Sequence, residues 1–204
     1  MTKCDMYRHF FKRVFDLIFA LVLLPFVLIS VVFTAPFIFL YDRGGIFYVA
    51  RRRGRSGKVF GMLKLRTMKV NAEEIRNPDG SVYTGKSDPR VTPVGKILRR
   101  FSIDELPQIL NVLKGDMSFI GPRPHLATTD YETLDEKRKK RLTVRPGITG
   151  YSQAYFRNTV DMEQKIENDC YYAENVSLLL DIKIIIKTVS TVLTGKGVHS
   201  DKKK

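Results

Sequence analysis

An uncharged apolar stretch near the N-terminus is the feature that most constrains how this chain folds. Twenty-four residues from Leu17 to Leu40 carry no charge, and Asp16 and Asp42 bound them. As a helix, such a stretch is long enough to cross a hydrocarbon core of roughly 30 Å. It exceeds the apolar part of a secretory signal peptide, and no small-residue cleavage site accompanies it. We therefore expect a membrane helix that stays in the mature protein.

Basic side chains flank this stretch on both sides. They are Lys3, Arg8, Lys12 and Arg13 before it, and Arg43, Arg51, Arg52, Arg53, Arg55 and Lys58 after it. Since Lys and Arg favour the cytoplasmic side, a spanning helix would export one of these clusters. A helix that bends inside the bilayer and returns keeps both at the anionic cytoplasmic leaflet. Pro25 favours such a bend, because proline removes a helical hydrogen bond and clashes with the preceding turn. An ordinary spanning helix with a tolerated proline is the alternative.

A second apolar segment, Val176 to Leu193, predicts a helix near the C-terminus. Its polar residues fall mostly on one side of a helical projection: Asp181, Lys183, Lys187, Ser190 and Thr194. This pattern is typical of a helix that lies in the membrane interface, with lysines reaching the headgroups. A buried core helix is the alternative. The tail from 195 to 204 is expected to be disordered.

Length, charge and the scarcity of metal-binding residue types narrow the class of protein. The 204 residues suit one catalytic unit with a membrane segment. A net charge of +14 points to a polyanionic partner, which is nucleic acid, anionic lipid or a phosphorylated substrate. Two cysteines and three histidines lie scattered, which predicts neither disulfides nor a zinc site. A catalytic metal would therefore need carboxylate ligands.

The region between the two apolar segments predicts one strand and two helices. A short apolar run favours a strand at Val59–Leu65. Thr92–Arg100 predicts a helix, since threonine suits the cap position and Pro93 suits the first turn. Ser102–Gly115 predicts the next helix, with Glu105 completing a capping box.

The polar loop before these helices contains the letters of a phosphate-binding loop, G-x-x-x-x-G-K-S, at Gly80–Ser87. That loop works only between a buried strand and the N-terminus of a helix. Here Arg76-Asn77-Pro78-Asp79 precedes it and Asp88-Pro89-Arg90 follows it. We interpret it as a chance match.

The adjacent carboxylates of Asp104 and Glu105 are the strongest candidates for chemistry. They lie close to two arginines, and arginine-containing turns follow at Gly121–Pro124 and Arg145–Gly147. In that setting a carboxylate can serve as a nucleophile or a magnesium ligand with phosphorylated substrates. The alternative is structural, because acidic residues are common in the first turn of a helix.

Taken together, the motifs resemble the monotopic polyprenyl-phosphate phosphoglycosyl transferases, which are bacterial sugar transferases that initiate glycoconjugate assembly. The resemblance covers nearly the whole chain and rests on Lys64–Met68, Asp88–Thr92, Gly95–Arg100, Ser102–Gln108, Asn111–Ser118 and Arg145–Gly150, in that order, with the basic N-terminal flank and Leu178–Lys183. Family members often carry serine before the bending proline, where this chain has Leu24.

The resemblance implies a function and roles for particular residues. A phosphosugar would pass from a nucleotide sugar, a UDP-sugar by this resemblance, to polyprenol (undecaprenyl) phosphate, and UMP would leave. Asp104 would be the nucleophile that forms an aspartyl-phosphosugar intermediate, and Glu105 would help to hold Mg²⁺. Phosphate or nucleotide contacts would come from Lys64, Arg66, Arg123, Arg145 and Arg52, with Asp169 as a further acid of the site.

The expected fold is mainly α with minor β, in a single-domain monotopic membrane protein. A basic flank and a re-entrant helix would occupy residues 1–46, a catalytic domain with interfacial amphipathic helices 47–194, and the tail 195–204. The protein would lie on membrane lipids at the cytoplasmic face of the bacterial inner membrane, and start O-antigen, capsule, exopolysaccharide or glycoprotein glycan synthesis. Two other classes are a membrane-tethered nucleic-acid binder, disfavoured because no nucleic-acid motif is present, and a nucleoside diphosphate sugar hydrolase, which needs no lipid acceptor.

Overall fold

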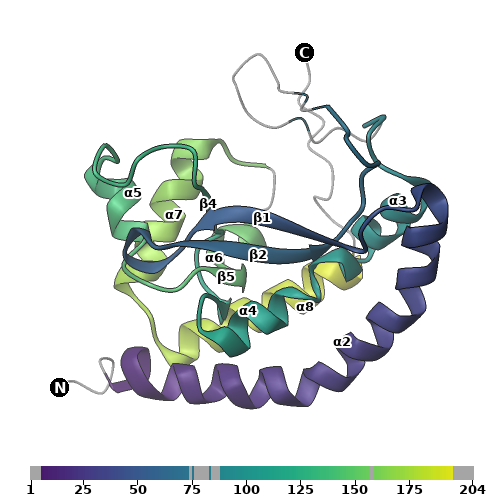
Figure 1. The fold of residues 1–204 in the computed structure, drawn as a ribbon. Helices are drawn as coiled ribbons and strands as arrows, with labels where there is room; N and C mark the ends of the chain where they lie inside the picture. Colours follow the sequence, from purple (N-terminus) through teal and green to yellow (C-terminus); the bar gives the residue numbers. More distant parts are fainter. Residues whose placement is uncertain (1–5, 74, 76–82, 84–87, 157–158, 195–204) are drawn as a thin grey trace.

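The computed structural model describes residues 6–73, 75, 83, 88–156 and 159–194, and it is mainly helical with a small amount of strand (Figure 1). The elements, in chain order, are η1 Tyr7–Phe11, α2 Lys12–Asp42, β1 Phe47–Arg53, η2 Arg55–Gly57, β2 Val59–Leu65, α3 Pro93–Arg100, η3 Ile103–Glu105, α4 Gln108–Lys114, β3 Ser118–Ile120, β4 His125–Leu126, α5 Glu136–Arg141, β5 Gly147–Thr149, α6 Tyr151–Tyr155, α7 Met162–Glu174 and α8 Leu178–Thr194. The expected mainly helical fold with minor sheet is confirmed. The segments 76–82 and 84–87, which hold most of the rejected phosphate-loop match, and the tail 195–204 lie outside the described residues.

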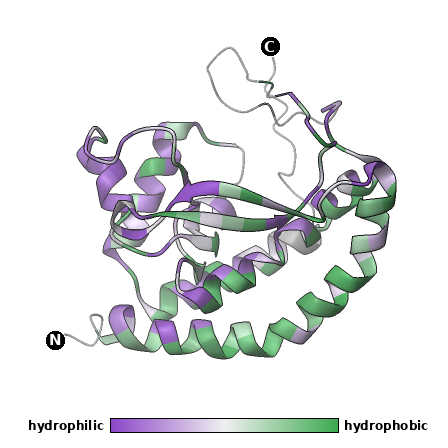
Figure 2. Cartoon of the chain, viewed as in Figure 1, coloured by the Kyte–Doolittle hydropathy of each residue, from purple (hydrophilic) through white to green (hydrophobic). Residues whose placement is uncertain are grey.

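The predicted apolar helix is present, and it continues directly from η1. Together they run from Tyr7 to Asp42, 36 residues that are long and apolar enough to cross a membrane by length and composition. Most of the side chains of α2 face outward, and its buried residues are Asp16, Ala20, Val27 and Ile38. Figure 2 shows the apolar colouring along the helix, and Figure 1 shows it bowed.

Both ends of this helix are fastened to the rest of the molecule. Near the N-terminal end, Asp181 of α8 accepts hydrogen bonds from Lys12 Nζ at 2.6 Å and from the Tyr7 hydroxyl at 2.7 Å. At the C-terminal end, Arg66 Nη1 lies 2.6 Å from Asp42 Oδ1. The helix is therefore held at both ends, and between them Ala20 and Val27 pack into a core with side chains of α4.

Two small sheets organise the chain between the helices. One has the strand order β2-β1-β4, and β1 pairs with β2 in an antiparallel register from Phe47 opposite Leu65 to Arg53 opposite Val59. The other pairs β3 with β5 in parallel. The predicted strand Val59–Leu65 has the predicted bounds. Apolar side chains of α2, the β1-β2 hairpin and α4 share one core, and β3, α6, α7 and α8 share a second.

The helix predicted at Thr92–Arg100 forms, and the one predicted from Ser102 begins later. The Thr92 hydroxyl caps α3 by accepting from the Gly95 amide at 2.9 Å. Ser102 is not a cap: it has a left-handed backbone, with φ 56°, and makes no side-chain capping bond. A 3₁₀ turn follows at 103–105, and α4 starts only at Gln108. Pro107 has no N–H to donate to the carbonyl four residues earlier, which disfavours a regular α-helix through this segment.

The C-terminal helix differs from the prediction in its bounds and in the orientation of Asp181. It covers Leu178–Thr194, and Asp181 points inward with 3 % exposure rather than toward solvent. Ile184 is fully buried beside it, whereas Leu179 and Ile186 are exposed. The expectation of one polar outer face was wrong at Asp181, because its carboxylate is the partner of Lys12, Tyr7 and Tyr172. The outward face is largely apolar.

Candidate active site

Four of the predicted site residues line one recess. Arg52 of β1, Lys64 of β2, Glu105 of η3 and Arg123, which follows β3, come together there. The remaining lining residues are Met62, Gln108, Pro124, Gly147, Ile148 and Gln153. One acidic and three basic side chains from distant parts of the sequence thus line the same recess.

The β1-β2 hairpin places Arg52 and Lys64 on the same side of the sheet. Alternate residues of a strand share a face, and so do residues directly opposite each other on paired strands. Lys64 therefore shares a face with Met62 and Phe60, and Phe60 lies opposite Arg52. Phe60 and Met62 are buried on that face. The same alternation that forms the core carries the two cations to the recess.

The acidic pair lies at the 3₁₀ turn beside Lys64. Lys64 Nζ lies 2.6 Å from Glu105 Oε1, and the Glu105 side chain is 28 % exposed. Asp104 is buried, with 8 % exposure. Burial raises the pKa of the Asp104 carboxyl above its usual value, and Glu105 adds to this, while Lys64 and Arg99 oppose it. Burial also favours a higher pKa for Glu105, but Lys64 and Arg123 outweigh it, so that pKa is lowered.

An asparagine fixes the position of this turn against β2. Asn111 of α4 accepts from the Leu63 amide at 2.9 Å and donates to the Gly61 carbonyl at 2.7 Å. These bonds satisfy backbone groups at the edge of β2 and attach α4 to the strand that carries Lys64. The attachment holds α4, which follows the acidic turn, against β2.

Arg123 is positioned from the other side by a buried ion pair. Arg141 of α5 donates to the Arg123 carbonyl at 2.8 Å and lies 2.5 Å from the Asp169 carboxylate. Asp169 is thus in contact with the support of Arg123 rather than with the recess lining. Partial burial and the nearby Arg123 both lower the pKa of Arg52. The Arg52 Nε is buried without a hydrogen-bond partner in the described part of the chain. A bound anion would give this nitrogen an acceptor and would be attracted by the neighbouring cations.

The structure holds two other predicted residues away from this recess. Arg66 binds Asp42 and the carbonyls of Ile38 and Gly45, and thereby fastens the end of α2. Arg145 lines a different pocket, with Arg8 and Arg55 among others.

Sequence reasoning missed Arg141, Gln153 and the clamping role of Asn111. Arg141 lies in the run Glu136–Arg141, which has the composition of a solvated basic surface, although its side chain is only 6 % exposed. Gln153 follows the Gly147–Gly150 turn on α6 and has no distinctive local pattern. For both side chains, the signal that could have identified them is a position on the inward-facing side of a short helix.

Comparisons with known proteins cover nearly the whole chain. The family model for bacterial sugar transferases matches residues 7–195. An uncharacterized sugar transferase, EpsL of Bacillus subtilis, is 42 % identical over 189 residues, covering 92 % of this chain and 90 % of that protein. A UDP-N-acetylgalactosamine-undecaprenyl-phosphate N-acetylgalactosaminephosphotransferase of Aeromonas hydrophila is 40 % identical over 93 % of this chain and 45 % of its own length. An undecaprenyl-phosphate galactose phosphotransferase of Salmonella typhimurium is 35 % identical over 94 % of this chain and 42 % of its own length. The chain spans nine-tenths of the first of these proteins and less than half of the other two. It belongs to the bacterial sugar transferase family.

Proposed function

We propose that the protein transfers a phosphosugar from a UDP-sugar to a polyprenol phosphate, with release of UMP, and so starts the assembly of a surface glycoconjugate. The observation that carries this proposal is Glu105 beside Lys64 in a recess that Arg52 and Arg123 also line, with the buried Asp104 next to Glu105 in the same 3₁₀ turn. Two of the relatives above carry undecaprenyl-phosphate and a sugar phosphotransferase activity in their names. Those names differ in the sugar, which is N-acetylgalactosamine in one and galactose in the other.

In the first step, an Asp104 carboxylate oxygen attacks the phosphorus that is linked to the sugar. The bond between that phosphorus and the bridging oxygen breaks, and UMP leaves with the bridging oxygen and its electron pair. The raised pKa of Asp104 makes its carboxylate a stronger nucleophile once it is ionised. Lys64, Arg52 and Arg123 counter the charge that develops on the phosphate oxygens and on UMP.

In the second step, a phosphate oxygen of the polyprenol phosphate attacks the phosphorus of the aspartyl-phosphosugar. The acyl-phosphate bond to Asp104 breaks and regenerates the carboxylate, and the product is a polyprenyl diphosphate sugar. The bond between the sugar and its oxygen is untouched throughout. The two steps use one recess in turn, which requires UMP to leave before the acceptor reacts.

Magnesium fits this acidic pair. Mg²⁺ commonly takes one or two carboxylates and completes its coordination with water and substrate phosphates, so it needs no cage of three protein acids. Glu105 is partly exposed in the recess and kept ionised by Lys64, and it is the residue that would hold the ion. When bound, the ion would neutralise charge on the diphosphate of the donor.

The same proposal places the protein at the cytoplasmic face of the inner membrane with a re-entrant N-terminal helix. Two contacts support it: Lys12 with Asp181 and Arg66 with Asp42 fasten the opposite ends of the helix to one folded body. The outward apolar face of α8, with Leu179 and Ile186 each 64 % exposed, would lie in the interface of the same leaflet. Both features bring the recess close to a lipid-borne acceptor.

The deciding experiment incubates the protein with a panel of UDP-sugars and no acceptor, followed by mass spectrometry of the intact protein and of peptides covering 102–108. A phosphosugar adduct on Asp104 and one equivalent of UMP are expected with the correct donor. Asp104→Asn should fold and form no adduct, whereas Glu105→Gln should weaken the magnesium dependence and slow adduct formation.

Two results would contradict the proposal. If no adduct forms under rapid quench, and UMP leaves only when donor and acceptor are both bound, the two-step mechanism is wrong. If turnover continues undiminished without polyprenol phosphate, the protein is a hydrolase of nucleotide sugars instead.

A further inference from the structure

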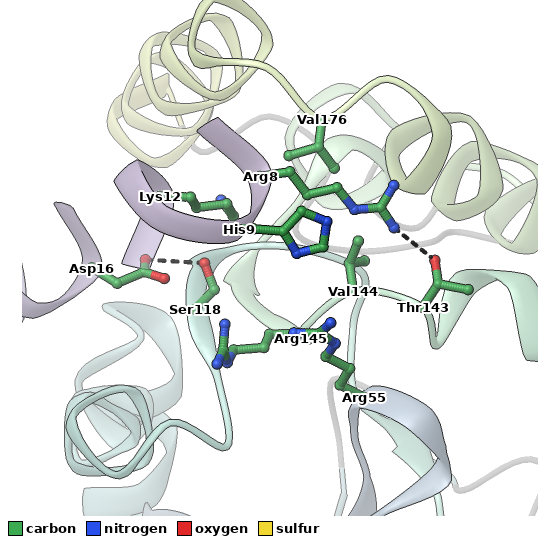
Figure 3. A pocket seen from close by; sticks show the side chains of 10 residues that line it. All are labelled: Arg8, His9, Lys12, Asp16, Arg55, Ser118, Thr143, Val144, Arg145 and Val176. Carbon is green, nitrogen blue, oxygen red and sulfur yellow. Dashed lines mark hydrogen bonds between the residues drawn. The ribbon is translucent and has the colours of Figure 1, made fainter. Parts of the chain in front are cut away.

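A second pocket lies beneath the N-terminal end of the long helix and shares no lining residue with the candidate active site. The N-terminal helix contributes Arg8, His9, Lys12 and Asp16, η2 contributes Arg55, and the rest of the lining is Ser118, Thr143, Val144, Arg145 and Val176. Figure 3 shows Arg8 and His9 on one side of the pocket and Arg145 and Arg55 on the other.

The pocket holds more positive than negative charge. Asp16 is its one acidic lining residue, and its Oδ1 already accepts from the Ser118 hydroxyl and the Phe119 amide, each at 3.0 Å. Lys12 is paired with Asp181. Within the described part of the chain, no carboxylate forms an ion pair with Arg8, Arg55 or Arg145. Three guanidinium groups therefore share one small space with a single carboxylate, Asp16, and form no ion pair within the described residues.

Among the described residues, few hydrogen bonds use the donors of these arginines. Arg8 uses one Nη2 bond to the Thr143 hydroxyl at 3.2 Å, and Arg145 uses its Nε for the Gly115 carbonyl at 3.0 Å. Partial burial and the neighbouring Arg13 and Arg55 lower the pKa of Arg145, as expected where like charges are held together. Guanidinium groups match the geometry of phosphate oxygens with paired donors.

We propose that this pocket binds the phosphate of an anionic phospholipid headgroup. Its position favours a lipid over a free anion, because Phe10, Phe11 and Phe15 are exposed on the same N-terminal segment as Arg8 and His9. Exposed aromatic residues beside a basic cluster are typical of a segment at the interface of an anionic leaflet. The inference relies on the membrane placement proposed above but not on the transfer reaction.

The test uses the full-length protein in a neutral detergent, without any sugar donor. The melting temperature is followed while short-chain phosphatidylglycerol, short-chain phosphatidylcholine or inorganic phosphate is added, since a ligand that binds the folded state raises it. Phosphatidylglycerol should stabilise the wild type at the lowest concentration. The Arg8→Gln/Arg55→Gln variant should need a phosphatidylglycerol concentration at least roughly tenfold higher for the same rise in melting temperature, because charge-assisted hydrogen bonds are lost.

The control is Lys137→Gln/Lys140→Gln, which removes two positive charges from α5, away from α2 (Figure 1), and should respond as the wild type does. If the double arginine variant does not fold, Thr143→Glu replaces it, because a carboxylate at this exposed position next to Arg8 should compete with the lipid phosphate.

An unchanged response in these pocket variants overturns the proposal. Equal potency of inorganic phosphate and phosphatidylglycerol overturns the assignment to a lipid. No turnover is measured, so the outcome of this test does not depend on whether the proposed transfer mechanism is right.

Discussion

Arg141 and Asp169 form a buried ion pair, with 2.5 Å between the guanidinium and the carboxylate and at most 6 % of either side chain exposed. The same guanidinium group donates to the Arg123 carbonyl at 2.8 Å. A pair that joins α5 to α7 therefore also holds the backbone beside the recess. Neither residue needs to touch a substrate to affect the site.

The ion pair predicts a pH dependence of stability. Burial raises the pKa of Asp169 from 3.8 to about 6, although Arg141 and Arg123 oppose the shift. Between these values the folded protein binds more protons than the unfolded chain, so stability falls as pH rises through this window. The Asp169→Asn side chain is uncharged at every pH, so the variant lacks this loss of stability. The difference in free energy of unfolding between the variant and the wild type should therefore shift in favour of the variant by up to about 3 kcal/mol between about pH 4 and pH 7.

Unfolding in detergent at several pH values measures this difference. Glu167→Gln, on the same helix with a half-exposed side chain, is the control and should show little change. A difference between Asp169→Asn and the wild type that stays constant with pH would show that Asp169 does not titrate in this range.

Lys64→Met should move the acid limb of the rate profile to higher pH. Lys64 lowers the pKa of Asp104, so its removal raises that pKa and less of the nucleophile is ionised at a given pH. The ratio kcat/KM should also fall by roughly tenfold or more, because Glu105 loses its charged partner. Lys114→Met, at a side chain 74 % exposed, is the matched control. An acid limb that stays in place would count against Asp104 as the titrating nucleophile.

Asn111→Ala should destabilise the protein by about 2–4 kcal/mol, since it leaves the Leu63 amide and the Gly61 carbonyl without their partner. Activity should fall by more than the loss of folded protein explains, because α4 directly follows the acidic turn. Chemical unfolding and assays at matched folded fraction separate the two effects. Gln164→Ala, at an exposed amide on α7, should change stability by less than about 0.5 kcal/mol. An Asn111→Ala variant with wild-type stability would refute the clamping role.

The re-entrant helix predicts that residues 3 and 58 face the same compartment. In a background of Cys4→Ser/Cys170→Ser, the variants Lys3→Cys and Lys58→Cys should both resist a membrane-impermeant maleimide in intact cells and react after lysis. A cysteine in a known periplasmic protein serves as the positive control. Labelling of one position in intact cells would establish a spanning helix.

Local patterns in the sequence determined the elements whose formation depends on near neighbours. The apolar stretch Leu17–Leu40 predicted a long apolar helix, and a short apolar run predicted the strand Val59–Leu65 with its observed bounds. Thr92 capped α3 because its hydroxyl reaches an amide three residues away. The motif set also identified Arg52, Lys64, Glu105 and Arg123, which share one recess.

Only the tertiary structure decided which of the cations and acids meet. Lys64 and Glu105 are 41 residues apart, and Lys12 and Asp181 are 169 apart, so no local pattern links them. The same long-range packing turned Asp181 inward, used Arg66 to fasten α2 and placed Arg145 in a separate pocket. Sequence patterns specify secondary structure because backbone hydrogen bonds and side-chain periodicity are local, whereas the grouping of charges depends on how the helices and strands pack against one another.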